Sequence, residues 1–326
     1  MKLTSRGEKQ AVAAGKALKT YVDPTTGEPL KPTCLFVSLL CRAQMTLELM
    51  SETMGLRATG GDGYSLPAVS SWRLNERHYG ALCGMSKLEA ESKFGVSVLS
   101  EWRNSWDTPP PPMDLDTLST WRRAVHCQTE THFTDPSGSE VRVLKEGRIP
   151  PLGSSFAEPG ADLEPPRPNE YTPSSTNWRD LMAAKMPASE SLKDTCERVL
   201  PIWSNGIAPR LARGETVLLV AHANTIRSIL FHVDPENVNE ETMKGVKIPS
   251  AAPLIVRFED REGEGLVNVG DVCERTGIKG EWVENDEIAE VRVPTSACIL
   301  LNSNVVSSQL SFCTIVGQSA LEHEIA

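Results

Sequence analysis

The sequence predicts an α/β protein with a mostly parallel sheet, and two observations support this. Two short apolar runs, CLFVSLL at 34–40 and TVLLVA at 216–221, have the composition of buried strands. Each run is followed within a few residues by a stretch whose apolar residues recur at helical spacing. Alternation of this kind predicts helices packed around a mostly parallel sheet, with functional residues at the carboxyl ends of its strands.

The first part of the chain supplies two helices and one strand. Residues 5–22 have apolar residues at helical spacing, and a turn-rich connector follows them. The run at 34–40 is then expected to be a buried strand. Residues 42–55 place apolar side chains on one helical face, and Gly55 is a typical stop for such a helix.

A long irregular excursion is expected at about 108–186. Residues 95–106 are predicted to be helical toward their end, and the four prolines at 109–112 then break regular structure. From there the chain is rich in Pro, Ser and Gly, which is typical of a surface segment that is partly disordered. A short helical piece is expected inside the excursion at 117–126.

Regular structure is predicted to return at 189–214, where apolar residues repeat every three or four positions. Pro201 is expected to kink this helix, because proline has no backbone N–H to donate. The run at 216–221 follows as a strand covered on both faces. His222 comes directly at the carboxyl end of that strand, and a further helix is predicted to start within a few residues.

Composition and charge exclude some classes of function. The chain has 326 residues and a formal net charge of −10, so a nucleic-acid binder, which is usually basic, is not expected. The eight cysteines show neither a CxxC pair nor zinc-type spacing, which indicates a reducing compartment and no metal site. No apolar run is long enough to span a membrane. An acidic protein can still hold an anionic ligand in a local basic pocket.

The stretch WRLNERHYGALCG at 72–84 gathers cations around one carboxylate. On a helix, Arg73 and Arg77 would share a face, and guanidinium groups suit phosphate or carboxylate oxygens. Bound phosphate would favour the protonated form of Glu76, which suits general acid–base catalysis. His222 could stabilise charge on a phosphoryl group in transfer. Taken alone, these residues leave a surface ion-pair network as an equal alternative.

The stretch at 72–84 resembles the hallmark of the cofactor-dependent phosphoglycerate mutases, within the histidine phosphatase superfamily. The resemblance runs from about Leu3 to about Asp260, with its motifs in the family's order. The other matching segments are SLLCRAQMTLELM (38–50), MSKLEAESKFG (85–95), PPPPM (109–113), SESLKDTCERVLPIW (189–203), LLVAHANTIRSIL (218–230) and IPSAAPLIVRFED (248–260). The resemblance implies a three-layer α/β/α fold, and we expect a catalytic domain of this type at 1–292.

The resemblance also implies an activity, a cofactor and site residues. It implies a glycolytic isomerase, an intramolecular phosphotransferase that interconverts 3-phosphoglycerate and 2-phosphoglycerate through a phosphohistidine. It implies 2,3-bisphosphoglycerate as the priming phosphoryl donor, no metal and a cytoplasmic location. The implied partner is a small anionic phosphorylated substrate, not nucleic acid or a membrane, and homo-oligomerisation is left open. By position, the implied catalytic residues are Glu76, His222 and Arg42, and the implied substrate-binding residues are Arg77, Tyr79, Lys87, Arg103 and Asn224.

The sequence departs from the family's pattern at the nucleophile. In the family a histidine in an N-terminal RHGES motif becomes phosphorylated, but no RHG tripeptide occurs here. We therefore expect the family's first strand to be missing and these 326 residues to be inactive. Ala223 replaces the usual glycine after the second histidine, and Asn104 replaces the second arginine of a substrate-binding pair. Two functions stay open: a mutase whose start lies outside this sequence, or a phosphate-ligand-binding pseudoenzyme or regulatory paralogue.

Residues 293–326 match nothing in the family. They contain two apolar runs, ACILL and FCTIV, with the β-branched content of short strands. Three interpretations are open: a loosely packed tail, a run that lies in the gap left by the missing first strand, or an exposed hairpin that promotes aggregation. We favour the loosely packed tail.

Overall fold

The structure is a computed structural model that covers the two predicted strand–helix units. The described residues are 3–24, 26–56, 66–114, 133–134, 140–141, 187–248, 252–261, 265–273, 278–283, 298–305 and 309–317. The helical piece expected at 117–126 and most of the excursion expected at 108–186 lie outside these residues.

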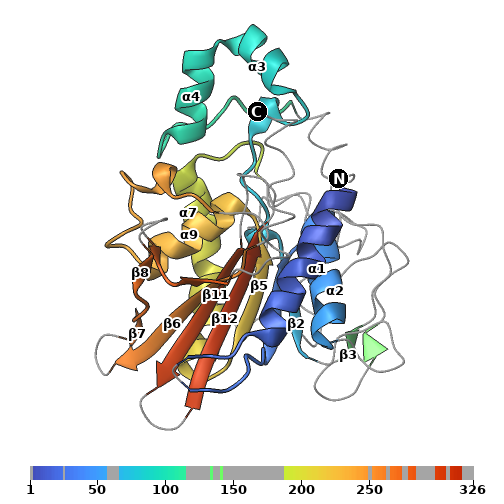
Figure 1. The fold of residues 1–326 in the computed structure, drawn as a ribbon. Helices are drawn as coiled ribbons and strands as arrows, with labels where there is room; N and C mark the ends of the chain where they lie inside the picture. The colour runs from blue at the N-terminus through green and yellow to red at the C-terminus, as the bar shows by residue number, and fades with distance from the viewer. Residues whose placement is uncertain are drawn as a thin grey trace, which may run out of the picture.

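A sheet of eight strands organises the fold (Figure 1). Its order is β10–β6–β11–β12–β5–β1–β2, and β7 pairs with β6. Neighbours are parallel from β2 through β1 and β5 to β12, and again between β6 and β11. This confirms the predicted α/β class and the mostly parallel sheet. The strands are β1 (Cys34–Ser38), β2 (Ala68–Ser71), β5 (Val217–Ala221), β6 (Leu254–Arg261), β7 (Gly265–Asn268), β10 (Glu281–Trp282), β11 (Cys298–Val305) and β12 (Gln309–Gly317).

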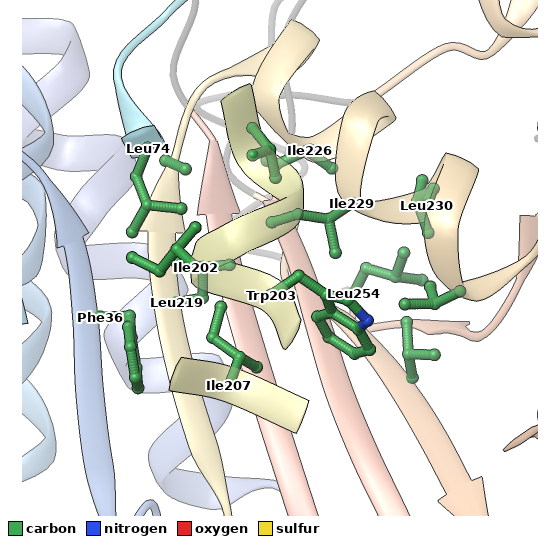
Figure 2. Packing of buried hydrophobic residues seen from close by; sticks show 14 of the residues in the cluster. Phe36, Leu74, Ile202, Trp203, Ile207, Leu219, Ile226, Ile229, Leu230 and Leu254 are labelled. Carbon is green, nitrogen blue, oxygen red and sulfur yellow. The ribbon is translucent and has the colours of Figure 1, made fainter. Parts of the chain in front are cut away.

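Helices cover both faces of the sheet, which gives three layers (Figure 1). Because strand side chains alternate between faces, Leu35 and Val37 of β1 pack in the cluster that holds α1 (Ser5–Thr20) and α2 (Cys41–Met54). Phe36 of the same strand packs in the opposite cluster, with α7 (Leu192–Ile202) and α9 (Ala223–Val233). Figure 2 shows this second core around Phe36, Leu219 and Ile202.

The helix ends follow from local chemistry. The side chain of Thr4 accepts a hydrogen bond from the backbone of Gly7 and caps α1. Gly55 ends α2 with φ of 76°, the left-handed conformation that glycine adopts without a steric penalty. Pro201 lies in the last turn of α7, and the chain then continues as a π-helical segment, η3 (Trp203–Ile207), before α8 (Ala208–Ala212). The helix predicted at 189–214 is therefore interrupted just after Pro201, while the kink itself stays a prediction.

The structure answers one conditional point at 72–79 and corrects one prediction at 95–106. Residues 72–79 do not form a helix: a short 3₁₀ turn, η1 (Trp72–Leu74), leads into an extended segment, so Arg73 and Arg77 share no helical face. The helix expected only toward the end of 95–106 spans nearly all of it, as α4 (Val96–Asn104), and follows α3 (Lys87–Phe94). The remaining short elements are η2 (Gly80–Leu82), η4 (Met243–Gly245), β3 (Phe133–Thr134), β4 (Glu140–Val141), β8 (Val272–Cys273) and β9 (Ile278–Lys279).

The segment interpreted as a loosely packed tail pairs into the centre of the sheet. β12 runs parallel to β5, from Cys313 opposite Val217 to Gly317 opposite Ala221. β11 runs parallel to β6 and antiparallel to β12. Both apolar runs thus satisfy backbone groups of β5 and β6 that would otherwise lack partners, so the favoured interpretation was wrong and the gap-filling one matches the structure. The boundary proposed at 292/293 stays a prediction.

None of the helices among the described residues is long and apolar enough to cross a membrane.

Candidate active site

The ends of β1 and β5 bring Ser38 and His222 together. The two strands are adjacent and parallel, with Val37 opposite Val220, so both end at the same edge of the sheet. His222 follows β5 directly and is the N-cap of α9. Its Nε2 atom lies 2.9 Å from the Oγ atom of Ser38, and both side chains are fully buried. A polar pair is thus built into the sheet edge where ligands bind in α/β folds.

Arg42 lies at the same edge, in the first turn of α2. Its side chain is buried, and its Nε atom has no hydrogen-bond partner in the described part of the chain. Burial lowers the pKa of Arg42, and the charges of Glu76 and Cys41 offset this only in part. A buried guanidinium group with unused donors is unfavourable unless an anion compensates it. Arg42 is therefore suited to bind an anion at this edge, a role that stays a prediction.

A buried ion pair holds the segment 72–78 across this edge. The Nε and Nη2 atoms of Arg198, on α7, lie 2.5 and 3.0 Å from the two carboxylate oxygens of Glu190. Arg198 also donates to three backbone carbonyls within 72–75. Glu190 in turn accepts from the backbone N–H of His78 at 2.8 Å. Charge-assisted, bidentate contacts of this kind fix geometry strongly.

Glu76 is the carboxylate of this segment that a ligand can reach. It is partly exposed, whereas its neighbours Asn75 and Arg77 are buried. It interacts electrostatically with Arg42 and with Arg77, and its Oε1 atom accepts from the backbone N–H of Arg77 at 2.8 Å. The structure thus gathers Arg42 and Glu76, two of the three predicted catalytic residues, while the third, His222, lies at the edge where α2 begins.

Tyr79 and Asn224 form a hydrogen-bonded chain with Arg227. The Nη1 atom of Arg227 donates to Oδ1 of Asn224 at 3.0 Å, and Nδ2 of Asn224 donates to the Tyr79 hydroxyl at 2.8 Å. Because the hydroxyl oxygen already accepts one bond, its own hydrogen is available for another acceptor. Burial raises the pKa of Tyr79, so the hydroxyl stays protonated. Tyr79 is therefore oriented as a hydrogen-bond donor.

Three other predicted substrate-binding residues have different surroundings. Arg77 is buried and donates to the backbone carbonyls of Glu190, Arg103 and Trp102, so most of its guanidinium group ties the 72–78 segment to α4. Lys87 is exposed at the start of α3, and Arg103 is half-buried near the end of α4. Asn104, at the position of the expected second arginine, bonds back to Ser100 of its own helix.

Gly80 fixes the proline-rich segment beside the site. Its φ is +56°, and a Cβ atom added there would lie 2.1 Å from the carbonyl oxygen of Pro111. The backbone N–H of Ala81 donates to that same oxygen at 2.8 Å, and the N–H of Met113 donates to the carbonyl of Ala188 at 3.1 Å. The two described ends of the excursion are thus joined next to the active-site segment.

The residues that hold the site in place were not predicted from the sequence. Arg198 and Glu190 stand in the sequence only as part of the motif at 189–203, and no local pattern marks Arg198 as buried, because α7 carries several other charged residues. Arg227 lies three residues after Asn224 and so on the same helical face. Ser38 is a single polar residue in an apolar run. His78 is buried, and its Nδ1 accepts a hydrogen bond from the N–H of Gly80. Within the residues that the structure describes, no three His, Cys, Asp or Glu side chains gather as a metal site would need.

Comparisons with known proteins agree on one family. A sequence model of the histidine phosphatase superfamily (branch 1) matches residues 1–143 and 164–270. The chain is 34% identical over 261 residues to a 2,3-bisphosphoglycerate-dependent phosphoglycerate mutase of Maricaulis maris, and the aligned region covers 79% of this chain and 79% of the relative. It is 32% identical over 263 residues to the protein of that name from Erythrobacter litoralis (81% of this chain, 85% of the relative). It is 30% identical over 272 residues to that of Corynebacterium jeikeium (83% and 79%).

Proposed function

This chain belongs to the histidine phosphatase superfamily, and we propose that its site binds the phosphoryl group of phosphoglycerates. We further propose that the reaction this site serves, where an RHG segment supplies the nucleophile, is the interconversion of 3-phosphoglycerate and 2-phosphoglycerate primed by 2,3-bisphosphoglycerate. The relatives are named 2,3-bisphosphoglycerate-dependent phosphoglycerate mutases, which supports this proposal. A glycolytic substrate of this kind favours a cytoplasmic location.

The observation that carries this proposal is the buried guanidinium group of Arg42. A phosphoryl group presents several anionic oxygens, which match the planar donors of arginine and offset its burial. The Tyr79 hydroxyl, held as a donor by Asn224, offers another hydrogen bond to such a group.

Each predicted residue then has a role in the proposed reaction. Glu76 would take the proton of the attacking hydroxyl and return it to the oxygen that loses the phosphoryl group. Arg42 and His222 would stabilise negative charge on the transferring group. The carboxylate end of the substrate would be held by Arg77, Lys87 and Arg103. Arg77 would contribute only the N–H groups that do not already donate to backbone carbonyls.

A second candidate function is binding without turnover, as a pseudoenzyme or regulatory paralogue. The observation that favours it is that none of the six histidines of these 326 residues stands in an RHG tripeptide. Transfer through a phosphohistidine needs such an acceptor, which gains the phosphoryl group as 2,3-bisphosphoglycerate becomes a monophosphoglycerate. We therefore propose that residues 1–326 bind phosphoglycerates and do not turn them over.

Two measurements test these proposals. Calorimetric titration with 3-phosphoglycerate should show binding that Arg42→Met weakens at least tenfold, because a charged hydrogen-bond donor is removed. Arg213→Met, which changes an arginine on the surface, is the control and should bind like the wild type. Absence of binding by the wild type, or unchanged binding by Arg42→Met, would refute the phosphate site. Incubation with 2,3-bisphosphoglycerate labelled with ³²P should leave residues 1–326 unlabelled, and acid-labile labelling would show that they contain a working nucleophile.

A further inference from the structure

We propose that Ser38 and Asn75 are positioning residues that hold His222 in the tautomer with its hydrogen on Nε2. The consequence is that any second proton the ring takes up must add at Nδ1. The tautomer follows from hydrogen-bond geometry alone, whereas its consequence for ligand binding rests on the function proposed above.

The backbone N–H of Leu39 fixes the orientation of the Asn75 side chain. The backbone N–H of Leu39 lies 2.9 Å from Oδ1 of Asn75 and can only donate. The atom that faces it must therefore be the amide oxygen of Asn75 and not the amide nitrogen. The hydrogen bond from Leu39 thus settles which atom of the Asn75 amide is oxygen and which is nitrogen.

The hydroxyl group of Ser38 donates its hydrogen to Asn75. It lies 2.8 Å from the same Oδ1 atom, and since an amide oxygen only accepts, Ser38 must donate its single hydrogen there. The backbone N–H of Leu40 donates to Oγ of Ser38 at 3.0 Å, which uses one of its two lone pairs.

His222 lies against the second lone pair of the Ser38 hydroxyl oxygen. Its Nε2 atom lies 2.9 Å from Oγ of Ser38, which has no hydrogen left to give. Nε2 must therefore carry the hydrogen and donate it. All three side chains are at most 4% exposed, so water does not compete for these bonds. In this tautomer the ring nitrogen without a hydrogen is Nδ1, and a charged ring forms only by protonation there.

The surrounding helices keep this arrangement in place. The carbonyl of Asn75 accepts from the Thr225 hydroxyl on α9 at 2.6 Å and from Nη2 of Arg198 on α7 at 3.1 Å. Asn75 is thus held through its backbone as well as its side chain. Protonation at Nδ1 would leave the contact between Nε2 and Ser38 intact, so this contact can orient the ring in both charge states.

Nitrogen NMR of protein labelled with ¹⁵N-histidine tests the tautomer without any ligand. His222 is assigned by the loss of its signals in His222→Asn, and spectra are recorded at alkaline pH, where imidazole rings are neutral. We expect a protonated Nε2 and an unprotonated Nδ1. Ser38→Ala should give a mixed or reversed tautomer, and Ser38→Thr, which keeps the hydroxyl, should restore the wild-type pattern. A proton on Nδ1 in the wild type, or an unchanged pattern in Ser38→Ala, would overturn the proposal.

Ser70→Ala is the matched control. Ser70 is a buried serine on the neighbouring strand β2, and its hydroxyl has no hydrogen-bond partner among the described residues. Its removal should leave the His222 spectrum and phosphoglycerate binding as in the wild type. If Ser70→Ala shifts the tautomer as Ser38→Ala does, the effect comes from general loosening of the sheet and the proposed positioning role is wrong.

Titration of the same proteins with 3-phosphoglycerate separates this proposal from the proposed function. Ser38→Ala should bind roughly tenfold more weakly, since one hydrogen bond to a charged group is lost. Equal affinity would overturn the consequence for binding. A wild type with the expected tautomer and no affinity for 3-phosphoglycerate would refute the proposed function and leave the tautomer standing. A wild type that binds 3-phosphoglycerate but carries its proton on Nδ1 would refute the tautomer and leave the proposed function standing.

Discussion

Replacing Arg198 by methionine is expected to destabilise the protein severely. Arg198 and Glu190 are 5% and 3% exposed, and Arg198 also donates to three carbonyls within 72–75. Methionine keeps the unbranched shape but leaves the buried Glu190 carboxylate with one hydrogen bond, from the N–H of His78, and with Arg77 as its electrostatic partner. Removing one partner of a buried ion pair costs about 3–5 kcal/mol. That is a large part of the total for a domain whose free energy of unfolding is about 5–15 kcal/mol.

Urea unfolding followed by circular dichroism measures this loss. The matched control is Arg213→Met, which breaks a pair whose arginine is 59% exposed and which should cost about 0–1 kcal/mol. The double variant Glu190→Met/Arg198→Met should lose less than Arg198→Met alone, because no buried charge is left unpaired. If the free energy of unfolding of Arg198→Met lies within about 1 kcal/mol of that of the control, the ion pair does not hold the active-site segment and the reasoning is refuted.

Three further predictions address turnover, the sheet and the proline-rich segment. Residues 1–326 should not interconvert 3- and 2-phosphoglycerate in the presence of 2,3-bisphosphoglycerate, and turnover at ordinary enzyme rates would contradict the assigned chemistry. A version that carries an added RHG strand should turn over, and Glu76→Gln should slow it roughly 10²–10⁴-fold; near-normal rates would remove Glu76 from its role. Deletion of 294–326 should lower the unfolding midpoint strongly or abolish soluble protein, since β11 and β12 fill the centre of the sheet, whereas an unchanged midpoint would mean that the tail does not complete the sheet. Gly80→Ala should be destabilising in the same urea assay because its Cβ would lie 2.1 Å from Pro111 O, and wild-type stability would show that the segment moves freely.

The sequence by itself determined the local elements and the family. Apolar runs located β1 and β5, and helical spacing located α1, α2, α7 and α9, because these patterns depend on neighbours in the chain. His222 was placed at a strand end for the same reason. The motifs that carry Arg42 and Glu76 pointed to the superfamily, since their order and spacing are features of the chain alone.

Only the tertiary structure decided what those side chains bind. Arg77 was predicted as a substrate ligand, but the fold turns most of its donors to carbonyls of α4 and of residue 190. The same fold buries Arg198 against Glu190 and places Ser38 between Asn75 and His222. It also decides that the last strands lie between β5 and β6. These outcomes join residues distant in the chain, and the burial of a polar group sets its partner through the cost of leaving it unpaired, which no local pattern records.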